Sequence, residues 1–136
     1  MSRYIPDNIR LAVKKRANYC CEYCRLHQDD FFFPFEIDHI LSVRHGGQTV
    51  LINLALSCSL CNRNKAADIG TYLDGKRRFV RLFNPRIDIW TEHFEVNHGE
   101  ILALTSIGRA TVKLLDLNNP DRIILRQILM TAERYP

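Results

Sequence analysis

Residues 21–24 have the sequence Cys-Glu-Tyr-Cys and residues 58–61 have the sequence Cys-Ser-Leu-Cys, with 33 residues between the two pairs. Two residues between paired cysteines allow a tight turn that points both sulfurs at one tetrahedral ion. Two such turns fill all four positions, so we predict a structural Zn²⁺ site with the ligands Cys21, Cys24, Cys58 and Cys61. A site of four thiolates leaves no position for water, so this ion should hold the fold rather than react.

Cys20 is the fifth cysteine and lies out of phase with the pair beside it. We expect it to be a packing residue. A disulfide framework is not expected in a cytosolic chain of this size, because that compartment keeps thiols reduced. A thiol redox protein is the other alternative, but it would need only one Cys-x-x-Cys at a helix start in a βαβ pattern. That alternative predicts a purified protein without zinc.

The length of 136 residues fits one domain, or one domain with an appendage. A composition of 46% apolar and 25% charged residues is ordinary for a globular protein and excludes disordered and collagen-like classes. No apolar run approaches the roughly 18 residues that span a bilayer, and the chain start lacks a signal-peptide pattern. We therefore expect a cytoplasmic protein with no membrane partner. The sequence leaves the oligomeric state open.

The net charge of +4 is unevenly distributed along the chain. Residues 1–25 and 61–86 carry an excess of basic residues, whereas residues 26–60 and 87–136 carry an excess of acidic ones. This arrangement suits a polyanion whose phosphates lie along the basic segments while carboxylates hold a cation between them. The alternative interpretation is that the two basic segments are simply solvated surfaces without a nucleic-acid partner.

Hydrophobic periodicity predicts an α+β fold. Apolar spacing indicates a helix from Asp7, as its cap, to about Asn18, and the Phe35–Ile40 alternation indicates a strand. The other predicted elements are a helix from Asn62 to about Leu73, a hairpin of strands 88–96 and 100–104, a helix capped by Ser106, and a helix 121–134 that buries Ile124, Leu125, Ile128 and Leu129. The predicted domains are a core with its leading helix, 1–75, and an extension packed on it, 76–136. Trp90 and the aromatic residues between Tyr72 and Phe83 are expected in the core.

Between and beside the cysteine pairs lie Asp38, His39, Asn53 and Asn62, a set of polar residues suited to phosphodiester chemistry. Such a reaction needs a base that deprotonates water and an oxygen-ligated cation that neutralises charge on phosphate. Imidazole titrates near neutral pH, and carboxylate and amide oxygens suit Mg²⁺ or Mn²⁺. Adjacent strand residues point to opposite faces, so spacing alone does not show how Asp38 and His39 could serve one phosphate.

Within Tyr19–Ala67 the pattern of both cysteine pairs, Glu36-Ile37-Asp38-His39-Ile40, Arg44-x-Gly46-Gly47, Asn53-Leu54 and Cys61-Asn62-x-x-Lys65 resembles the HNH endonucleases and their ββα-metal fold. The resemblance implies a DNA endonuclease in which His39 is the general base and Asp38 and Asn62 hold Mg²⁺ or Mn²⁺. It implies that Asn53 ties the loop between the two strands through backbone hydrogen bonds.

Several assignments have structural alternatives. Asn62 could be a helix N-cap, and Arg44, Arg63 and Lys65 could contact phosphate or be merely solvated. A zinc-stabilised nucleic-acid-binding module with no or auxiliary catalytic activity is the alternative function. Intact Asp38, His39 and Asn62 argue against it, because a dead site is expected to have lost at least one of them.

Overall fold

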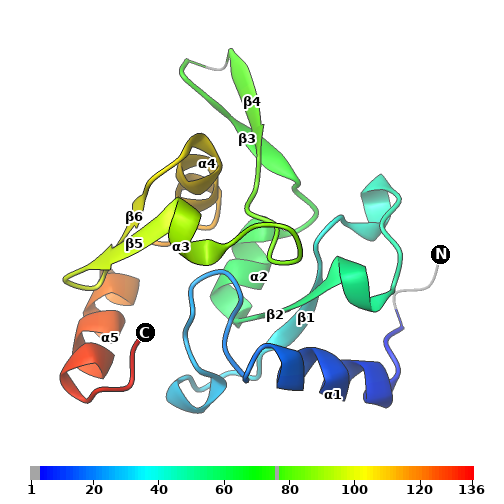
Figure 1. The fold of residues 1–136 in the computed structure, drawn as a ribbon, viewed down its shortest axis with the longest axis horizontal. Helices are drawn as coiled ribbons and strands as arrows, with labels where there is room; N and C mark the ends of the chain where they lie inside the picture. The colour runs from blue at the N-terminus through cyan, green and yellow to red at the C-terminus, as the bar shows by residue number, and fades with distance from the viewer. Residues whose placement is uncertain (1–3, 76) are drawn as a thin grey trace. The chain divides into compact units, whose positions relative to one another are not determined.

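The computed structural model describes residues 4–75 and 77–136 and divides the chain into two compact units, Met1–Ile69 and Gly70–Pro136 (Figure 1). The elements of the first unit are α1 (Asp7–Arg16), β1 (Glu36–His39), β2 (Leu54–Ser57) and α2 (Ser59–Lys65), with 3₁₀ turns at Gln28–Asp30, Val43–His45 and Leu51–Asn53. The α+β class is confirmed. The predicted division into domains 1–75 and 76–136 stays a prediction.

Helix α1 begins at Asp7, its predicted cap, so the N-cap lies one residue earlier than predicted. Pro6 occupies the N-cap position, and Asp7 lies in the first turn, where a carboxylate interacts favourably with the helix dipole. The helix ends at Arg16 because Asn18 and Tyr19 adopt positive φ angles of 53° and 59°. The side chain of Arg16 donates to the carbonyl oxygen of Leu54 at 2.6 Å, which ties α1 to β2.

Strands β1 and β2 pair antiparallel, with Asp38 opposite Ala55 and His39 opposite Leu54. All four residues of β2 are buried. Helix α2 follows β2 directly, with Cys58 at its N-cap, which completes a ββα unit. The helix starts three residues earlier than predicted and ends at Lys65, because Ala66 adopts a φ of 47°. The predicted continuation of this helix to Leu73 is therefore wrong.

The second unit contains β3 (Gly70–Leu73), β4 (Arg78–Arg81), α3 (Trp90–His93), β5 (Phe94–Asn97), β6 (Glu100–Ala103), α4 (Ser106–Leu114) and α5 (Pro120–Thr131). The strands form two antiparallel hairpins, β3–β4 and β5–β6. The second hairpin was predicted, but its first strand begins at Phe94 because the preceding four residues are helical. Thr105, not Ser106, caps α4, since its Oγ1 accepts from the Gly108 N–H at 3.0 Å.

The core beneath hairpin β3–β4 contains Leu73, Val80, Leu82 and Ala110. Helix α5 differs from its prediction, because Ile124 and Ile128 are 52% and 60% exposed. In their place the helix buries two arginines, Arg122 and Arg126, whose guanidinium groups donate to the carbonyl oxygens of Leu115, Gly99 and Leu117. Apolar periodicity does not reveal such a face, because the buried groups are polar and satisfied by backbone. No helix in the described part of the chain has the length and apolar character to cross a membrane.

Candidate active site

The four paired cysteines form one buried cluster. The Sγ atoms of Cys21, Cys24, Cys58 and Cys61 all lie within 4.8 Å of one another. The Sγ atoms of Cys24 and Cys58 are 3.7 Å apart, close to the roughly 3.8 Å that bonds of about 2.3 Å to a tetrahedral zinc ion impose. The cluster is therefore positioned for a metal ion, and Cys20 lies outside it, as expected.

Each cysteine pair is closed by a backbone hydrogen bond to sulfur. The Cys24 N–H lies 3.5 Å from Cys21 Sγ, and the Cys61 N–H lies 3.4 Å from Cys58 Sγ. Burial raises the pKa of the Cys21 and Cys61 thiols well above their ordinary value. A metal ion binds the thiolate form, so we expect metal binding at this cluster to release protons.

Asp38 on β1 is the most deeply buried carboxylate of the ββα unit, with 4% of its surface exposed. Its Oδ2 accepts a hydrogen bond from the Tyr23 hydroxyl at 2.7 Å, and Lys65 Nζ lies 3.2 Å from the same oxygen. Burial raises the pKa of the Asp38 carboxyl, against the opposing effects of Lys65 and Tyr23. Burial also raises the pKa of Tyr23, which keeps its hydroxyl protonated as a donor to Asp38.

His39 follows Asp38 on β1 and is half-buried. Its Nε2 lies 2.9 Å from Thr49 Oγ1, in the connection between β1 and β2. This contact restrains the orientation of the imidazole ring. One ring nitrogen of a neutral imidazole carries the proton, and the contact at Nε2 influences which one does.

Asn53 holds the connection between the two strands. Its Oδ1 accepts from the Leu41 N–H at 2.8 Å, and its Nδ2 donates to the carbonyl oxygens of Leu41 and Gln48, each at 2.9 Å. Gly47 makes this close approach possible, since a Cβ there would lie 1.7 Å from the Leu41 oxygen and 2.8 Å from Asn53 Nδ2. Gly46 has a φ of 91°, the left-handed conformation that ends the 3₁₀ turn Val43–His45.

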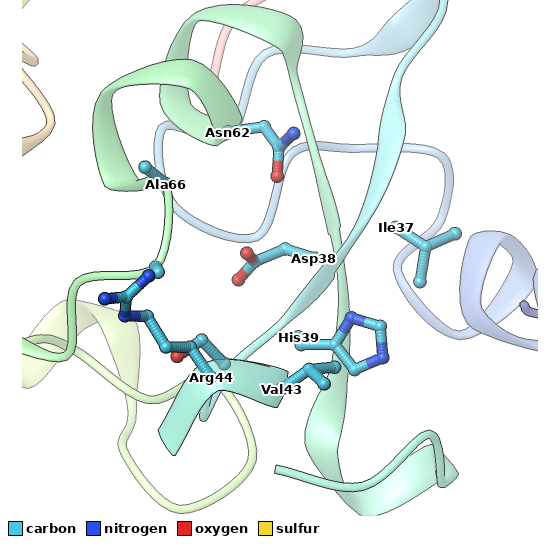
Figure 2. A pocket seen from close by; sticks show the side chains of 9 residues that line it. Ile37, Asp38, His39, Val43, Arg44, Asn62 and Ala66 are labelled. Carbon is cyan, nitrogen blue, oxygen red and sulfur yellow. The ribbon is translucent and has the colours of Figure 1, made fainter. Parts of the chain in front are cut away.

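Asn62 is the fourth residue of α2, so it is not the helix N-cap; that position belongs to Cys58. Its Nδ2 donates to Glu36 Oε2 at 2.7 Å. This contact fixes the amide, and Figure 2 shows the amide oxygen on the side of the side chain that faces Asp38.

A pocket of about 380 Å³ lies at the junction of β1, α2 and the connection between the strands (Figure 2). It is lined by Ile37, Asp38, His39, Ser42, Val43, Arg44, Asn62, Ala66 and Ala67. Asp38, His39 and Asn62 therefore border one space, with Arg44 beside them. Asn53 does not line the pocket but supports the connection that forms its wall.

Two of the predicted phosphate contacts lie away from this pocket. Arg63 is exposed on α2 and is not among the lining residues. Lys65 is 1% exposed, and its Nζ donates to the His39 carbonyl oxygen at 3.0 Å in addition to contacting Asp38. A surface contact between Lys65 and phosphate is therefore contradicted, because its ammonium is used inside the fold.

Three residues that contact the site were missed by sequence reasoning: Tyr23, Glu36 and Thr49. Glu36 has a usable signal, since strand alternation places it on the face of Asp38, two residues away. Tyr23 lies between two cysteines, and Thr49 lies in an irregular connection, so no periodicity identifies either.

Comparison with known proteins agrees with this geometry. Residues 21–68 match the family model described as HNH endonuclease, and this range contains both cysteine pairs and the residues Asp38, His39, Asn53 and Asn62. This match confirms the resemblance to the HNH endonucleases that the motifs of residues 21–68 indicated.

One relative among the curated proteins is the Septu protein PtuB of Bacillus thuringiensis. The two chains are 29% identical over 124 residues, an alignment that covers 90% of this chain and 46% of the relative. The chain thus spans about half the length of that relative. No solved structure matched the chain.

Proposed function

We propose that this protein is a metal-dependent endonuclease that hydrolyses phosphodiester bonds of DNA. The observation that carries the proposal is that Asp38, His39 and Asn62 border the same pocket within the segment that matches the HNH model. These residues supply the three requirements of the reaction: a base, oxygen ligands for a cation, and a fixed geometry.

The donors present fit a hard divalent ion. A carboxylate offers about four acceptor sites, so Asp38 retains acceptor capacity beyond Tyr23 and Lys65. The Asn62 amide oxygen faces Asp38 because the amide nitrogen is bound to Glu36. Such oxygen donors favour Mg²⁺ or Mn²⁺ over catalytic zinc. When bound, the ion would act as a Lewis acid that stabilises charge on the phosphate oxygens.

His39 is the proposed general base and takes a proton from the attacking water. Thr49 keeps its ring from rotating, and Lys65 holds the backbone of the same residue through its carbonyl oxygen. Arg44 is exposed and lines the pocket, so it is the cation best placed to contact a phosphate oxygen. Asn53 acts through the backbone of the connection and does not touch the substrate.

The four-cysteine cluster is proposed as a structural Zn²⁺ site. Helix α2 begins immediately after Cys58 and carries Cys61 and Asn62 in consecutive positions. Fixing the two sulfurs therefore fixes the backbone that presents Asn62. Zinc and the catalytic ion have separate ligands. The position of Asn62, a proposed ligand of the catalytic ion, nevertheless depends on the zinc site.

Incubation of supercoiled plasmid with the full chain tests the proposal. We expect cleavage with Mg²⁺ or Mn²⁺, none with EDTA, and a fall of roughly 10²-fold to 10⁴-fold for His39→Ala, the usual contribution of a positioned base. His98→Ala, which removes an exposed imidazole of the second unit, is the matched control and should cleave like the parent.

Two outcomes would overturn the proposal. Parental cleavage by a folded His39→Ala protein would remove this residue from the mechanism. DNA binding without cleavage in either metal would instead support the alternative, a zinc-stabilised nucleic-acid-binding module.

A further inference from the structure

Hairpin β3–β4 of the second unit presents two aromatic side chains to solvent. Tyr72 and Phe79 are paired across the strands, and each is 51% exposed. Their ring centroids are 5.2 Å apart with an interplanar angle of 73°, an edge-to-face pair. This contradicts the expectation of core positions for Tyr72 and Phe79, whereas Phe83 and Trp90 are buried, as expected. The inner face of the hairpin is instead occupied by Leu73 and Val80.

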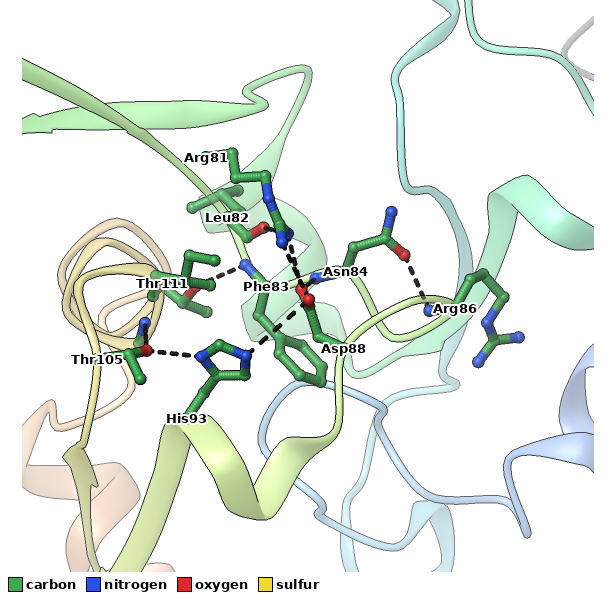
Figure 3. A network of polar contacts seen from close by, with 11 residues as sticks. Arg81, Leu82, Phe83, Asn84, Arg86, Asp88, His93, Thr105 and Thr111 are labelled. Carbon is green, nitrogen blue, oxygen red and sulfur yellow. Dashed lines mark hydrogen bonds and ion pairs between the residues drawn. The ribbon is translucent and has the colours of Figure 1, made fainter.

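Among the described residues, five exposed cations lie on the hairpin, at its turn and on α4. They come from the hairpin and from α4, which packs against it, and they are Arg77, Arg78, Arg81, Arg109 and Lys113. Two carboxylates face them. Asp74 lies 2.8 Å from Arg78 and 3.7 Å from Arg109, and Asp88 pairs with Arg81 at 2.7 Å (Figure 3). Of the strand cations, Arg81 shares the face of Tyr72 and Phe79. Arg78 lies instead on the inner face with Leu73 and Val80, on the side of α4. Five cations against two carboxylates leave the hairpin and α4 together positive.

The cations differ in how far they are engaged. Arg77 forms no ion pair and no side-chain hydrogen bond with any described residue. Lys113 Nζ donates to the Tyr72 carbonyl oxygen at 2.8 Å, which places this charge beside the aromatic pair. Arg77 is therefore the cation with most freedom to meet a phosphate, whereas Arg81 is held by Asp88.

The aromatic rings are held in place by the strand beneath them. A Cβ at Gly70 would lie 2.7 Å from the Phe79 ring, so the ring of Phe79 covers the backbone of Gly70. Lys113 anchors the backbone of Tyr72. Rings fixed in this way lose little conformational entropy when they bind a planar partner.

Exposed rings beside arginines fit a single-stranded nucleic acid. Unpaired bases stack on aromatic side chains, and basic residues track the phosphates between them. A protein partner would find little apolar surface here, only the rings of Tyr72 and Phe79, and would need carboxylates that match the cations. A duplex keeps its bases stacked inside and would use only the cations. The surface therefore matches unpaired bases and their phosphates best.

We propose that hairpin β3–β4 is a binding platform for single-stranded nucleic acid, on which Tyr72 and Phe79 stack against bases while Arg77 binds a phosphate. The proposal rests on the proposed function in so far as the strand bound here belongs to the substrate of the nuclease. Binding to the platform itself requires no cleavage.

The test measures binding of the full chain carrying His39→Ala, which prevents cleavage, to a fluorescent 20-nucleotide single strand and to the matching duplex. Tyr72→Leu with Phe79→Leu keeps apolar cover over Gly70 while it removes both aromatic rings. We expect this pair of substitutions to weaken single-strand binding roughly fivefold to a hundredfold, the range of base stacking on aromatic residues. Duplex binding should change much less.

A second variant tests the phosphate contact. Arg77→Ala should reduce the slope of log affinity against log salt concentration for the single strand by about 0.7, the value for one phosphate contact. Arg134→Ala, an exposed cation on the segment after α5, is the charge-matched control. Ile124→Ala with Ile128→Ala is the control for loss of exposed apolar surface, and neither control should change the affinity.

Parental single-strand affinity of the double leucine variant, with circular dichroism showing a folded protein, would overturn the proposal. An equal loss on strand and duplex would also overturn it, since stacking cannot explain such a loss. Competition by polyglutamate that equals competition by an unlabelled strand of the same charge would assign the surface to an acidic protein partner instead. Absence of plasmid cleavage by the parent would contradict the proposed function but leave this binding result interpretable.

Discussion

Lys65 Nζ lies 3.2 Å from Asp38 Oδ2 in a pair whose side chains are 1% and 4% exposed. The two residues come from α2 and β1, and the same ammonium group donates to the carbonyl oxygen of His39. One lysine therefore joins the helix that carries Asn62 to the strand that carries Asp38 and His39. A buried pair of this kind contributes little net stability compared with apolar residues, but loss of one partner leaves an uncompensated charge.

Lys65→Met should consequently destabilise the protein by roughly 3–5 kcal/mol, because it leaves the Asp38 carboxylate buried without its cation. Urea unfolding measures the change. Arg63→Met, which removes an exposed cation from the same helix, should change stability by no more than about 0.5 kcal/mol. Equal unfolding midpoints for the two variants would mean that Lys65 does not compensate Asp38.

Asn62→Ala should shift half-maximal cleavage to higher Mg²⁺ concentration, because it removes an oxygen donor from the proposed catalytic site. Asn62→His should retain activity and favour transition metals, since imidazole is the softer ligand. Glu36→Ala should give a smaller shift than Asn62→Ala, because the amide remains but loses its 2.7 Å anchor. Metal titrations of cleavage measure all three. A parental titration for both Asn62 variants would exclude this residue as a ligand.

Asn53→Ala should lower the free energy of unfolding by roughly 1–3 kcal/mol, since three hydrogen bonds to the backbone of the connection are lost. Cleavage should fall as well, because this connection carries Thr49 and Arg44. Gln48→Ala is the control, because Asn53 binds only the carbonyl oxygen of Gln48, which the substitution keeps. If the Asn53→Ala protein were as stable as the control, these three hydrogen bonds would contribute nothing to the free energy of unfolding.

The motif region could be predicted from sequence because its chemistry is local. The Cys-x-x-Cys spacing alone specified the four-sulfur cluster, and the strand alternation around Ile37 specified β1. Lys65 was misjudged because lysines are almost always exposed, and nothing in the sequence shows that this one meets a buried carboxylate.

The second unit was harder to predict because its segments are short and tertiary contacts decide them. Residues 70–73 have apolar spacing that a helix could use, yet they pair with Arg78–Arg81 as a strand. Likewise, Arg122 and Arg126 bury their guanidinium groups on backbone carbonyls whose positions depend on the fold of other segments. Such polar burial has no signature in hydrophobic periodicity.

Asp88→Asn should make stability less dependent on pH below pH 4. The hydrogen bonds from Arg81, more than the other contacts, lower the pKa of the Asp88 carboxyl. A carboxyl with a lowered pKa in the folded state stabilises the fold above its unfolded pKa of about 3.9, and this contribution is lost as the pH falls through the folded pKa. The variant should therefore be less stable than the parent at pH 7, with a difference that narrows toward pH 3.

Urea unfolding of both proteins across this pH range measures the difference. Glu95→Gln, an exposed carboxylate on β5, is the control and should follow the parent throughout. A constant difference between the Asp88→Asn protein and the parent from pH 7 to pH 3 would contradict the role of Arg81.

Replacement of a zinc ligand should be far more damaging than any of these changes. The ββα unit and its two cysteine turns span a segment below the roughly 70 to 80 residues at which a hydrophobic core alone becomes adequate. Zinc bound by four thiolates can contribute about 10 kcal/mol or more of folding free energy in small domains. Cys24→Ser and Cys58→Ser should therefore give insoluble or partly unfolded protein without nuclease activity. Cys20→Ser is the control and should be nearly silent, because Cys20 lies outside the cluster.

The chelator EDTA separates the two proposed metals. It should stop cleavage at once by removing weakly held Mg²⁺, and added Mg²⁺ should restore cleavage because zinc remains in its buried cluster. Elemental analysis after brief dialysis against EDTA should find close to one zinc per chain, and none of the four Sγ atoms should react with a thiol reagent before unfolding. An active protein that contains no zinc would contradict both the ligand assignment and the dependence of Asn62 on a structural metal.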